Sequence, residues 1–164
     1  MKKRQIVIEY QEFSQVIEMT EAEQNLLASA KEAALNAYSP YSRFNVGAAV
    51  LLENGKVITG NNQENAAYPS GLCAERVALF SASAQYPGVG VQAIAITAHS
   101  DETEINEPVT PCGACRQVMV EYENRSKELT KVIMMGEKGP VIVAPSVKSL
   151  IPLSFDGNHL LKNK

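Results

Sequence analysis

The first regular pattern of apolar and polar positions predicts a helix that begins after Thr20. Thr20 and Glu23 form a capping box, in which each side chain bonds the backbone of the other at a helix start. Apolar side chains then recur at helical spacing, at Leu26, Leu27, Ala30, Ala34 and Ala37. Pro40 predicts the end of this helix, because proline disfavours helical backbone in the residue before it.

The rest of the chain alternates between strand-like and helix-like runs. Residues 44–53 and 56–60 predict two strands, and Asn54-Gly55 between them is the strongest short signal for a hairpin. The later runs predict a helix at 72–85, a strand at 91–98, a helix at 112–123, and strands at 131–136 and 140–145.

This order of elements predicts an α/β fold. Strand–helix–strand–helix–strand implies parallel neighbours joined by right-handed crossovers. Only Glu137-Lys138-Gly139 separates the last two strands, and so short a connection joins only antiparallel strands. We therefore expect a three-layer α/β/α domain with a mixed sheet of about five strands. The alternative, an open doubly wound nucleotide-binding fold, would carry G-x-G-x-x-G after a strand, and no such motif is present.

Composition and charge narrow the function classes. The 164 residues fit one domain, and 15 basic against 18 acidic residues give a net charge of −3. The sequence shows no stripe of basic residues that could face the phosphates of a nucleic acid. We therefore expect a small-molecule substrate and no nucleic-acid partner. The longest apolar run, 46–52, is too short to span a bilayer, and the basic start MKKR is not followed by the apolar run of a secretory signal. We therefore expect no membrane partner.

The three cysteines carry the candidate chemistry. They cannot pair evenly, and two lie as C-x-x-C, which favours a reducing, cytoplasmic compartment over a disulfide framework. Cys112 and Cys115 fall in the first turn of a predicted helix, where residues three apart are about 5–6 Å apart. Cys73 begins the preceding helix, and helices that follow adjacent parallel strands open at one edge of the sheet. The three sulfurs are thus expected to converge on one zinc ion.

Two other interpretations of the cysteines are open. A redox pair at C-x-x-C would leave Cys73 without a role. A structural zinc needs a fourth ligand, and only His99 and His159 are available, neither at a zinc-binding spacing from the cysteines. With three protein ligands the fourth position is open to water, as in catalytic zinc sites. Glu75, two residues after Cys73, can face that position without binding the metal.

These motifs resemble a known family. C-A-E at 73–75 followed by P-C-G-A-C-R-Q-V at 111–118 resembles the zinc-dependent cytidine deaminase superfamily. SPYSRFNVGAA, GNNQENAAYPSGLCAER, TPCGACRQVM and LIPLSF are similar, in order and spacing, to the short-chain homotetrameric members. The resemblance implies a deaminase domain at 20–155, an N-terminal extension of unknown role at 1–19 and a C-terminal tail at 156–164.

The resemblance implies hydrolytic deamination of cytidine and 2′-deoxycytidine to uridine and 2′-deoxyuridine, with release of ammonia, in pyrimidine salvage. One zinc per chain would lower the pKa of its bound water, so that hydroxide attacks C4 of the base. Glu75 would carry protons from this water to ring N3 and to the leaving amine. We expect Arg76 and the positive N-termini of the two helices to compensate the negative charge of three thiolates.

The resemblance also implies the substrate contacts. Asn62 and Glu64 would bind the ribose 3′-hydroxyl, Phe44 would line the base pocket, and the backbone around Ala66 and Glu75 would contact the base. Tyr68 is expected in hydrogen bonds across a subunit boundary of a homotetramer.

Phe155, in LIPLSF, is expected to complete the site of a neighbouring subunit, so that active sites are shared. The alternative is a phenylalanine that fills its own core.

Three other functions stay open. The chain could deaminate another cytosine nucleoside, such as a blasticidin-type antibiotic, or a base in RNA or DNA. It could also be a zinc module without enzymatic activity. The acidic charge balance and the antiparallel last hairpin count against a polynucleotide editor. Glu75 and the missing fourth ligand count against a structural zinc module.

Overall fold

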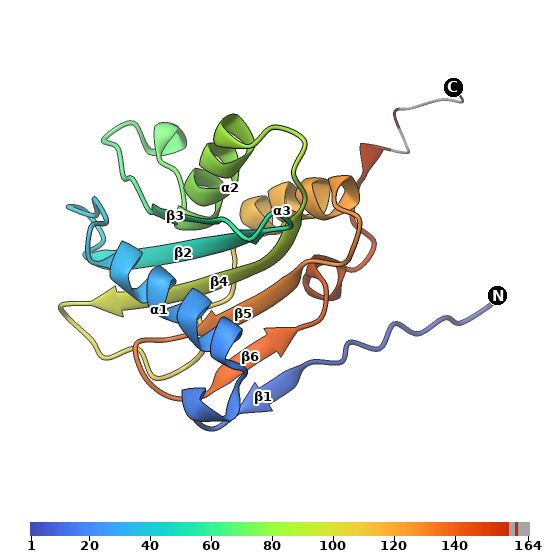
Figure 1. Cartoon of the computed structure of the whole chain (residues 1–164), viewed down its shortest axis with the longest axis horizontal. Coiled ribbons are helices and arrows are strands. Elements are labelled where there is room, and N and C mark those ends of the chain that lie inside the picture. Colours follow the sequence, from blue (N-terminus) through green and yellow to red (C-terminus); the bar gives the residue numbers. More distant parts are fainter. Residues whose placement is uncertain (158–159, 161–164) are drawn as a thin grey trace.

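The computed structural model describes residues 1–157 and 160, which form a mixed sheet with helices on both faces (Figure 1). No helix in this part of the chain combines the length and apolar character needed to cross a membrane. The strands are β1 (Gln11–Phe13), β2 (Phe44–Leu52), β3 (Val57–Asn61), β4 (Val91–Ser100), β5 (Lys131–Met135) and β6 (Val141–Ala144). The α-helices are α1 (Glu21–Ala34), α2 (Ala74–Gln85) and α3 (Gly113–Arg125), and short 3₁₀ helices are η1 (Val16–Glu18), η2 (Tyr68–Ser70) and η3 (Val147–Leu150).

The sheet has the order β1-β6-β5-β4-β2-β3. The hairpin of β2 and β3, the parallel pair of β4 and β5, and the antiparallel pair of β5 and β6 are confirmed. The expectation that the strands on either side of α2 are parallel neighbours is wrong, because β2 lies between β3 and β4 and is antiparallel to both. The reason is burial. The middle of β2 is fully buried and is paired along both edges, whereas β3 alternates between exposed and covered positions and forms the sheet edge.

A sixth strand, β1, exceeds the expected number of about five. β1 lies in the segment predicted as an N-terminal extension and pairs antiparallel with β6, with Gln11 opposite Val143 and Phe13 opposite Val141. Met19, from the same segment, is buried in the core under α1. Residues 11–19 thus contribute to the same folded unit as the rest of the sheet.

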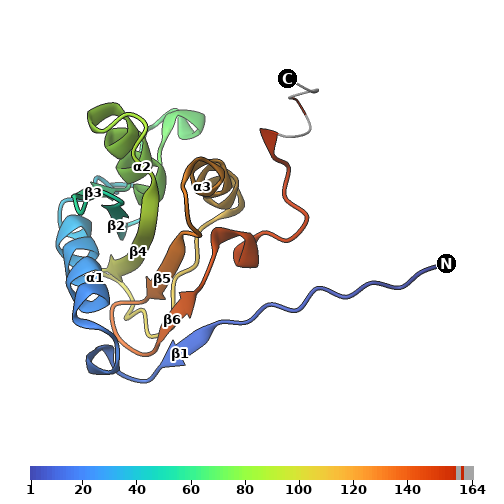
Figure 2. The same cartoon turned by 45° about the vertical axis from the view of Figure 1, so that its right-hand side comes forward.

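The helices form the two outer layers, as predicted (Figure 2). On one face, α1 packs mainly against β2 and β4, and its Leu26, Leu27 and Ala30 belong to an apolar cluster that also includes residues of β5 and β6. On the other face, α2 and α3 pack side by side over a second apolar cluster that includes Leu79 and Met119. The capping box at the start of α1 is confirmed.

Helix α1 ends earlier than predicted. Its last residue is Ala34, so the expectation that Ala37 continues the helical face is wrong. The chain must turn after Ala34 because the Tyr38 N–H donates to the carbonyl oxygen of Asn62, 3.0 Å away, beside the sheet. This contact brings the loop that starts at Tyr38 toward the end of β3.

Two glycines set the distance between the helices and the sheet. A Cβ atom on Gly60 of β3 would lie 2.4 Å from the Ala78 nitrogen of α2. A Cβ atom on Gly47 of β2 would lie 2.0 Å from the Ala30 oxygen of α1. Both distances are far below van der Waals contact, so glycine lets each helix backbone lie directly on its strand.

Candidate active site

The three cysteines meet where two helices begin. Cys73 is the N-cap residue of α2, Cys112 is the N-cap residue of α3, and Cys115 lies in the first turn of α3. Their sulfurs all lie within 4.8 Å of one another, and the Sγ atoms of Cys73 and Cys112 are 3.9 Å apart. Two thiolates about 2.3 Å from one tetrahedral zinc ion are themselves about 3.8 Å apart. The predicted convergence is confirmed, and the spacing fits zinc.

The protonation of the cluster also suits a metal. A hydrogen bond from Cys115, helped by those from Arg76 and Cys112, lowers the pKa of the Cys73 thiol to about 5. The same contact with Cys73, together with burial, raises the pKa of Cys115. Cys73 is therefore a thiolate at neutral pH even without a metal, and a bound cation favours the deprotonated form of the sulfurs that hold it.

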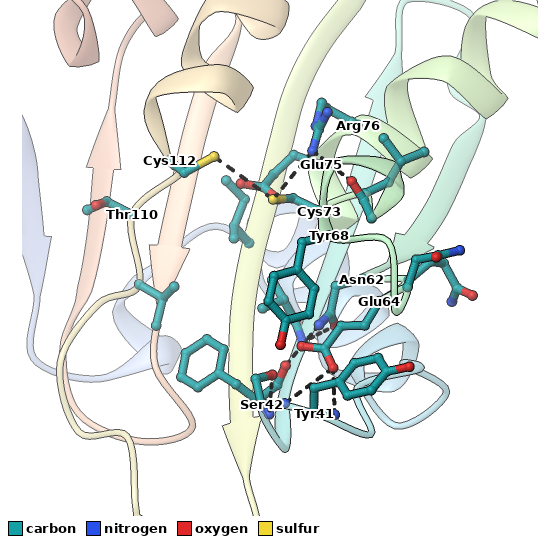
Figure 3. A pocket seen from close by; sticks show the side chains of 18 residues that line it. Tyr41, Ser42, Asn62, Glu64, Tyr68, Cys73, Glu75, Arg76, Thr110 and Cys112 are labelled. Carbon is teal, nitrogen blue, oxygen red and sulfur yellow. Dashed lines mark hydrogen bonds between the residues drawn. The ribbon is translucent and has the colours of Figure 1, made fainter.

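Glu75 lies in the first turn of α2 and lines the same pocket as Cys73 and Cys112 (Figure 3). Its side chain is buried, with 4% of its surface exposed. Burial raises the pKa of the Glu75 carboxyl, and the neighbouring Cys73 charge adds to the effect. A carboxyl group whose pKa is raised holds a proton more readily than an exposed one, which suits a group that accepts and then donates protons.

Arg76 contacts the cluster from α2. Its Nη2 lies 4.0 Å from the Cys73 Sγ and 3.4 Å from the Gly71 carbonyl oxygen. The Nε of Arg76 is buried and has no hydrogen-bond partner among the described residues. The guanidinium therefore places positive charge beside the sulfurs, as the sequence predicted.

The pocket next to the cysteines has a volume of about 810 Å³, enough for a small-molecule ligand. Phe44, Asn62, Glu64 and Tyr68 line it. Asn62 and Glu64 lie farther from the sulfurs, and Tyr68 lies between them and Cys73 (Figure 3). Ala66 does not line it. The structure thus brings most of the predicted substrate contacts into one pocket with Cys73, Cys112 and Glu75.

Backbone contacts hold the polar residues of the pocket. The Asn62 side chain accepts from the Val46 N–H at 2.7 Å and donates to the Phe44 carbonyl at 2.9 Å, which ties it to the start of β2. The Glu64 carboxylate accepts from the backbone N–H groups of Tyr41 and Ser42 at 2.9 and 3.2 Å. A hydrogen bond from the Ser42 side chain lowers the pKa of Glu64, with help from these N–H groups, so the carboxylate is ionised at neutral pH.

Sequence reasoning missed part of the lining. Tyr41 and Ser42 line the pocket, although SPYSRF was expected only to end a helix and to place Phe44. The Tyr41 and Tyr68 rings meet edge to face, with centroids 6.2 Å apart. Thr110, just before the second cysteine motif, was also missed. Their place in the sequence could have identified these residues, because each lies within a few positions of a motif that was recognised.

Phe155 and the histidines lie apart from this pocket. Phe155 is not in the pocket lining of its own chain, and 55% of its surface is exposed. His99 lies between the carboxylates of Asp101 and Glu137, 3.2 Å from each, and is not part of the sulfur cluster. His159 lies outside the described residues.

Comparison with known proteins gives a consistent picture. Residues 20–130 match the model of the cytidine and deoxycytidylate deaminase zinc-binding region. Cytidine deaminases from Halalkalibacterium halodurans and Sporosarcina psychrophila are 51% and 40% identical to this chain over 137 residues, which are 84% of this chain and 96% and 93% of theirs. The crystal structure of the cytidine deaminase from Burkholderia pseudomallei is 43% identical and superposes with a TM-score of 0.71, over 84% of this chain and 100% of that one.

Proposed function

Because this chain belongs to the zinc-dependent cytidine and deoxycytidylate deaminase family, we propose that it hydrolyses cytidine and 2′-deoxycytidine to the corresponding uridines and ammonia. The observation that carries this proposal is a cluster of three thiols, two of which line one pocket together with a buried carboxyl group. Cys73, Cys112 and Cys115 would hold one zinc ion. When bound, zinc supplies a Lewis acid that lowers the pKa of a coordinated water.

Glu75 would carry the protons of the reaction. Its raised pKa lets it accept a proton from the attacking water, deliver it to ring N3 and later protonate the leaving amine. Arg76 would compensate the negative charge of the thiolates through its contact with the Cys73 sulfur.

The other end of the pocket would bind the sugar. The ionised Glu64 carboxylate would accept a hydrogen bond from the ribose 3′-hydroxyl, with Asn62 beside it. Phe44 would line the base site, and the backbone near Ala66 would contribute further contacts. Losing the carboxylate–hydroxyl bond would leave a polar group without a partner in the pocket, which costs about 1–3 kcal/mol.

We also propose a homotetramer in which Phe155 packs on the base in a neighbouring subunit and Tyr68 hydrogen-bonds across the boundary. The exposure of both rings, 55% for Phe155 and 78% for Tyr68, supports this assembly. The three cysteines, which form no disulfide, support a cytoplasmic location. The reaction would serve pyrimidine salvage.

The activity is tested by the loss of ultraviolet absorbance after addition of cytidine, with cytosine, CMP and blasticidin S as comparison substrates. We expect turnover of cytidine, and no turnover of the free base or the nucleotide. Glu75→Gln should lower kcat by at least about 10²–10⁴-fold and keep the zinc, because Glu75 is not a ligand. Near-normal turnover by this variant would overturn the role of Glu75.

The shared site is tested by mixing two inactive or weakened variants. Phe155→Ala chains keep Glu75, and Glu75→Gln chains keep Phe155. Mixed tetramers should regain some complete sites, so activity should exceed the sum of the two separate preparations. Additive activity after verified subunit exchange, or a monomer by sedimentation, would contradict the proposal.

A further inference from the structure

One arginine outside the assigned site links two separate segments of the chain. Arg116 follows Cys115 on the first turns of α3. Its Nε donates to the Pro111 carbonyl at 2.7 Å, and its Nη2 donates to the Thr110 Oγ1 at 3.2 Å. Its Nη1 donates to the Leu150 carbonyl at 2.7 Å. All three guanidinium nitrogens therefore have partners, two before the metal ligand Cys112 and one at the end of η3.

The next residue on α3 holds the far end of the same C-terminal segment. Gln117 Nε2 donates to the Phe155 carbonyl oxygen at 2.8 Å. Between Leu150 and Phe155 the chain forms no helix or strand, and Leu153 has a φ of 60°, in the left-handed region. A segment without its own backbone ladder depends on such side-chain contacts for its position.

A third side chain of α3 fixes the start of η3, the short helix that leads into this segment. Glu123, two helical turns after Arg116, is buried, and its carboxylate accepts from the Ser146 hydroxyl at 2.9 Å and from the Val147 N–H at 2.8 Å. Residues seven apart lie on the same helix face. One face of α3 therefore holds η3 at both ends, through Glu123 at its start and Arg116 at its finish.

We propose that Arg116 is a positioning residue that couples the loop carrying the metal ligand Cys112 to the C-terminal segment carrying Phe155. It acts on the metal site through the Pro111 carbonyl and the Thr110 hydroxyl, because these fix the backbone that enters Cys112. It acts on the C-terminal segment through the Leu150 carbonyl. The effect on the metal site needs only the three cysteines, whereas an effect on catalysis through Phe155 rests on the proposed function.

The geometry requires arginine. A guanidinium presents five N–H donors in a rigid planar fork, and here donors on all three of its nitrogens reach acceptors in two segments. A lysine ammonium is a single point of donors on a flexible stem, so it can hold one segment but not both. Lys at this position should therefore preserve part of the coupling between the two segments, and an uncharged side chain should abolish nearly all of it.

Different variants test the link to the metal loop and the link to the C-terminal segment separately. Arg116→Gln weakens both links and Arg116→Lys at least one of them, whereas Gln117→Met removes only the contact with Phe155. Arg125→Gln is the matched control, because Arg125 lies at the other end of α3, stacks over the Tyr122 ring at 5.0 Å and contacts neither segment. Circular dichroism and thermal unfolding first verify that each variant folds.

Two measurements report on the proposal. The first is the rate at which zinc-loaded protein releases its metal to the chromogenic chelator 4-(2-pyridylazo)resorcinol. Arg116→Gln should release zinc about 10–100-fold faster than wild type, which is the usual effect of losing a contact that orients a metal ligand, and Arg116→Lys should be intermediate. Gln117→Met and Arg125→Gln should stay within about twofold of wild type.

The second measurement is hydrogen exchange of the peptide 147–157. Its amides should exchange faster in Arg116→Gln and in Gln117→Met, and at the wild-type rate in Arg125→Gln. For cytidine, Gln117→Met should raise KM with little change in kcat, because it displaces Phe155 and leaves the metal loop in place.

Wild-type zinc release in Arg116→Gln would overturn the link to the metal loop, and wild-type exchange of 147–157 would overturn the link to the C-terminal segment. If Arg116→Gln does not fold, Arg116→Lys replaces it, and wild-type values of both zinc release and exchange in Arg116→Lys would overturn the proposal. Zinc release and hydrogen exchange do not depend on turnover. A wild-type protein that failed to deaminate cytidine would therefore refute the proposed function and leave these two measurements valid.

Discussion

The contact between Gly60 and α2 predicts that a single methyl group impairs catalysis from outside the pocket. In Gly60→Ala the new Cβ would lie 2.4 Å from the Ala78 nitrogen and 2.7 Å from the Ala74 oxygen, whereas ordinary contact begins at 3.4 Å. The helix must therefore move by about 1 Å away from β3, because both clashing atoms are backbone. Cys73 and Glu75 lie at the end of α2 that moves.

The magnitude follows from two separate effects. Overpacking of this kind destabilises a fold by about 1–3 kcal/mol. Misplacement of reacting groups by about 1 Å costs about 10²-fold in rate. We therefore expect Gly60→Ala to fold with a lower free energy of unfolding in urea and to lose about 10²-fold in kcat for cytidine. The zinc content is measured on the same preparation, so that metal loss and displacement of Glu75 are told apart.

Gly47→Ala is the control for destabilisation alone. Its Cβ would also clash with backbone, and more closely, 2.0 Å from the Ala30 oxygen, but α1 carries none of the residues assigned to the site. It should lose comparable stability and keep kcat within about threefold of wild type. The reasoning is refuted if Gly60→Ala keeps full kcat despite lost stability, since the edge strand β3 would then have moved instead of α2. Equal losses of kcat in both variants would point to general loosening.

Three further outcomes are expected. Chelation of zinc at neutral pH should abolish turnover and lower the melting temperature, because a ligand of the folded state stabilises it, and added zinc should restore both. The depressed pKa of Glu64 contributes stability that is present above its ordinary value of 4.5 and is lost as pH falls through the folded pKa. Ser42→Ala should therefore raise that pKa, and an unmoved ¹³C titration of the carboxyl group would contradict the assignment. Removal of residues 1–10 should leave the melting temperature nearly unchanged, whereas removal of 1–13 should lower it because β1 is lost.

The features that could be predicted from the sequence depend on residues close together in the chain. Thr20 and Glu23 cap α1 three residues apart, and Gly55 adopts the positive φ, 79°, that its hairpin needs. Cys112 and Cys115 share one helical turn. Each of these arrangements is determined mainly by local backbone geometry, so a short stretch of sequence contains most of the information.

The features that were missed depend on pairing between distant segments. β2 lies between β3 and β4 because its middle is buried and needs a partner on each edge, and no local pattern distinguishes this order from parallel neighbours. β1 is only three residues long and forms a strand because β6 offers it an edge. The same limit applies to Arg116, whose partner Leu150 is 34 residues away.

The acids at the two helix starts of the site have pKa values that are shifted in different directions. Each helix N-terminus carries about half a positive charge, which favours the ionised form of a neighbouring thiol or carboxyl group. Cys73 follows this expectation, because hydrogen bonds from Cys115 and Arg76 lower its pKa to about 5. Glu75 lies at the same helix start, and yet its pKa is raised, because burial outweighs the backbone hydrogen bond that lowers it. Hydrogen bonds therefore favour the ionised form of Cys73, whereas burial favours the protonated form of Glu75, and the contact with Cys73 together with burial does the same for Cys115. Cys73 is left ready to bind a cation, and Glu75 is left able to transfer a proton.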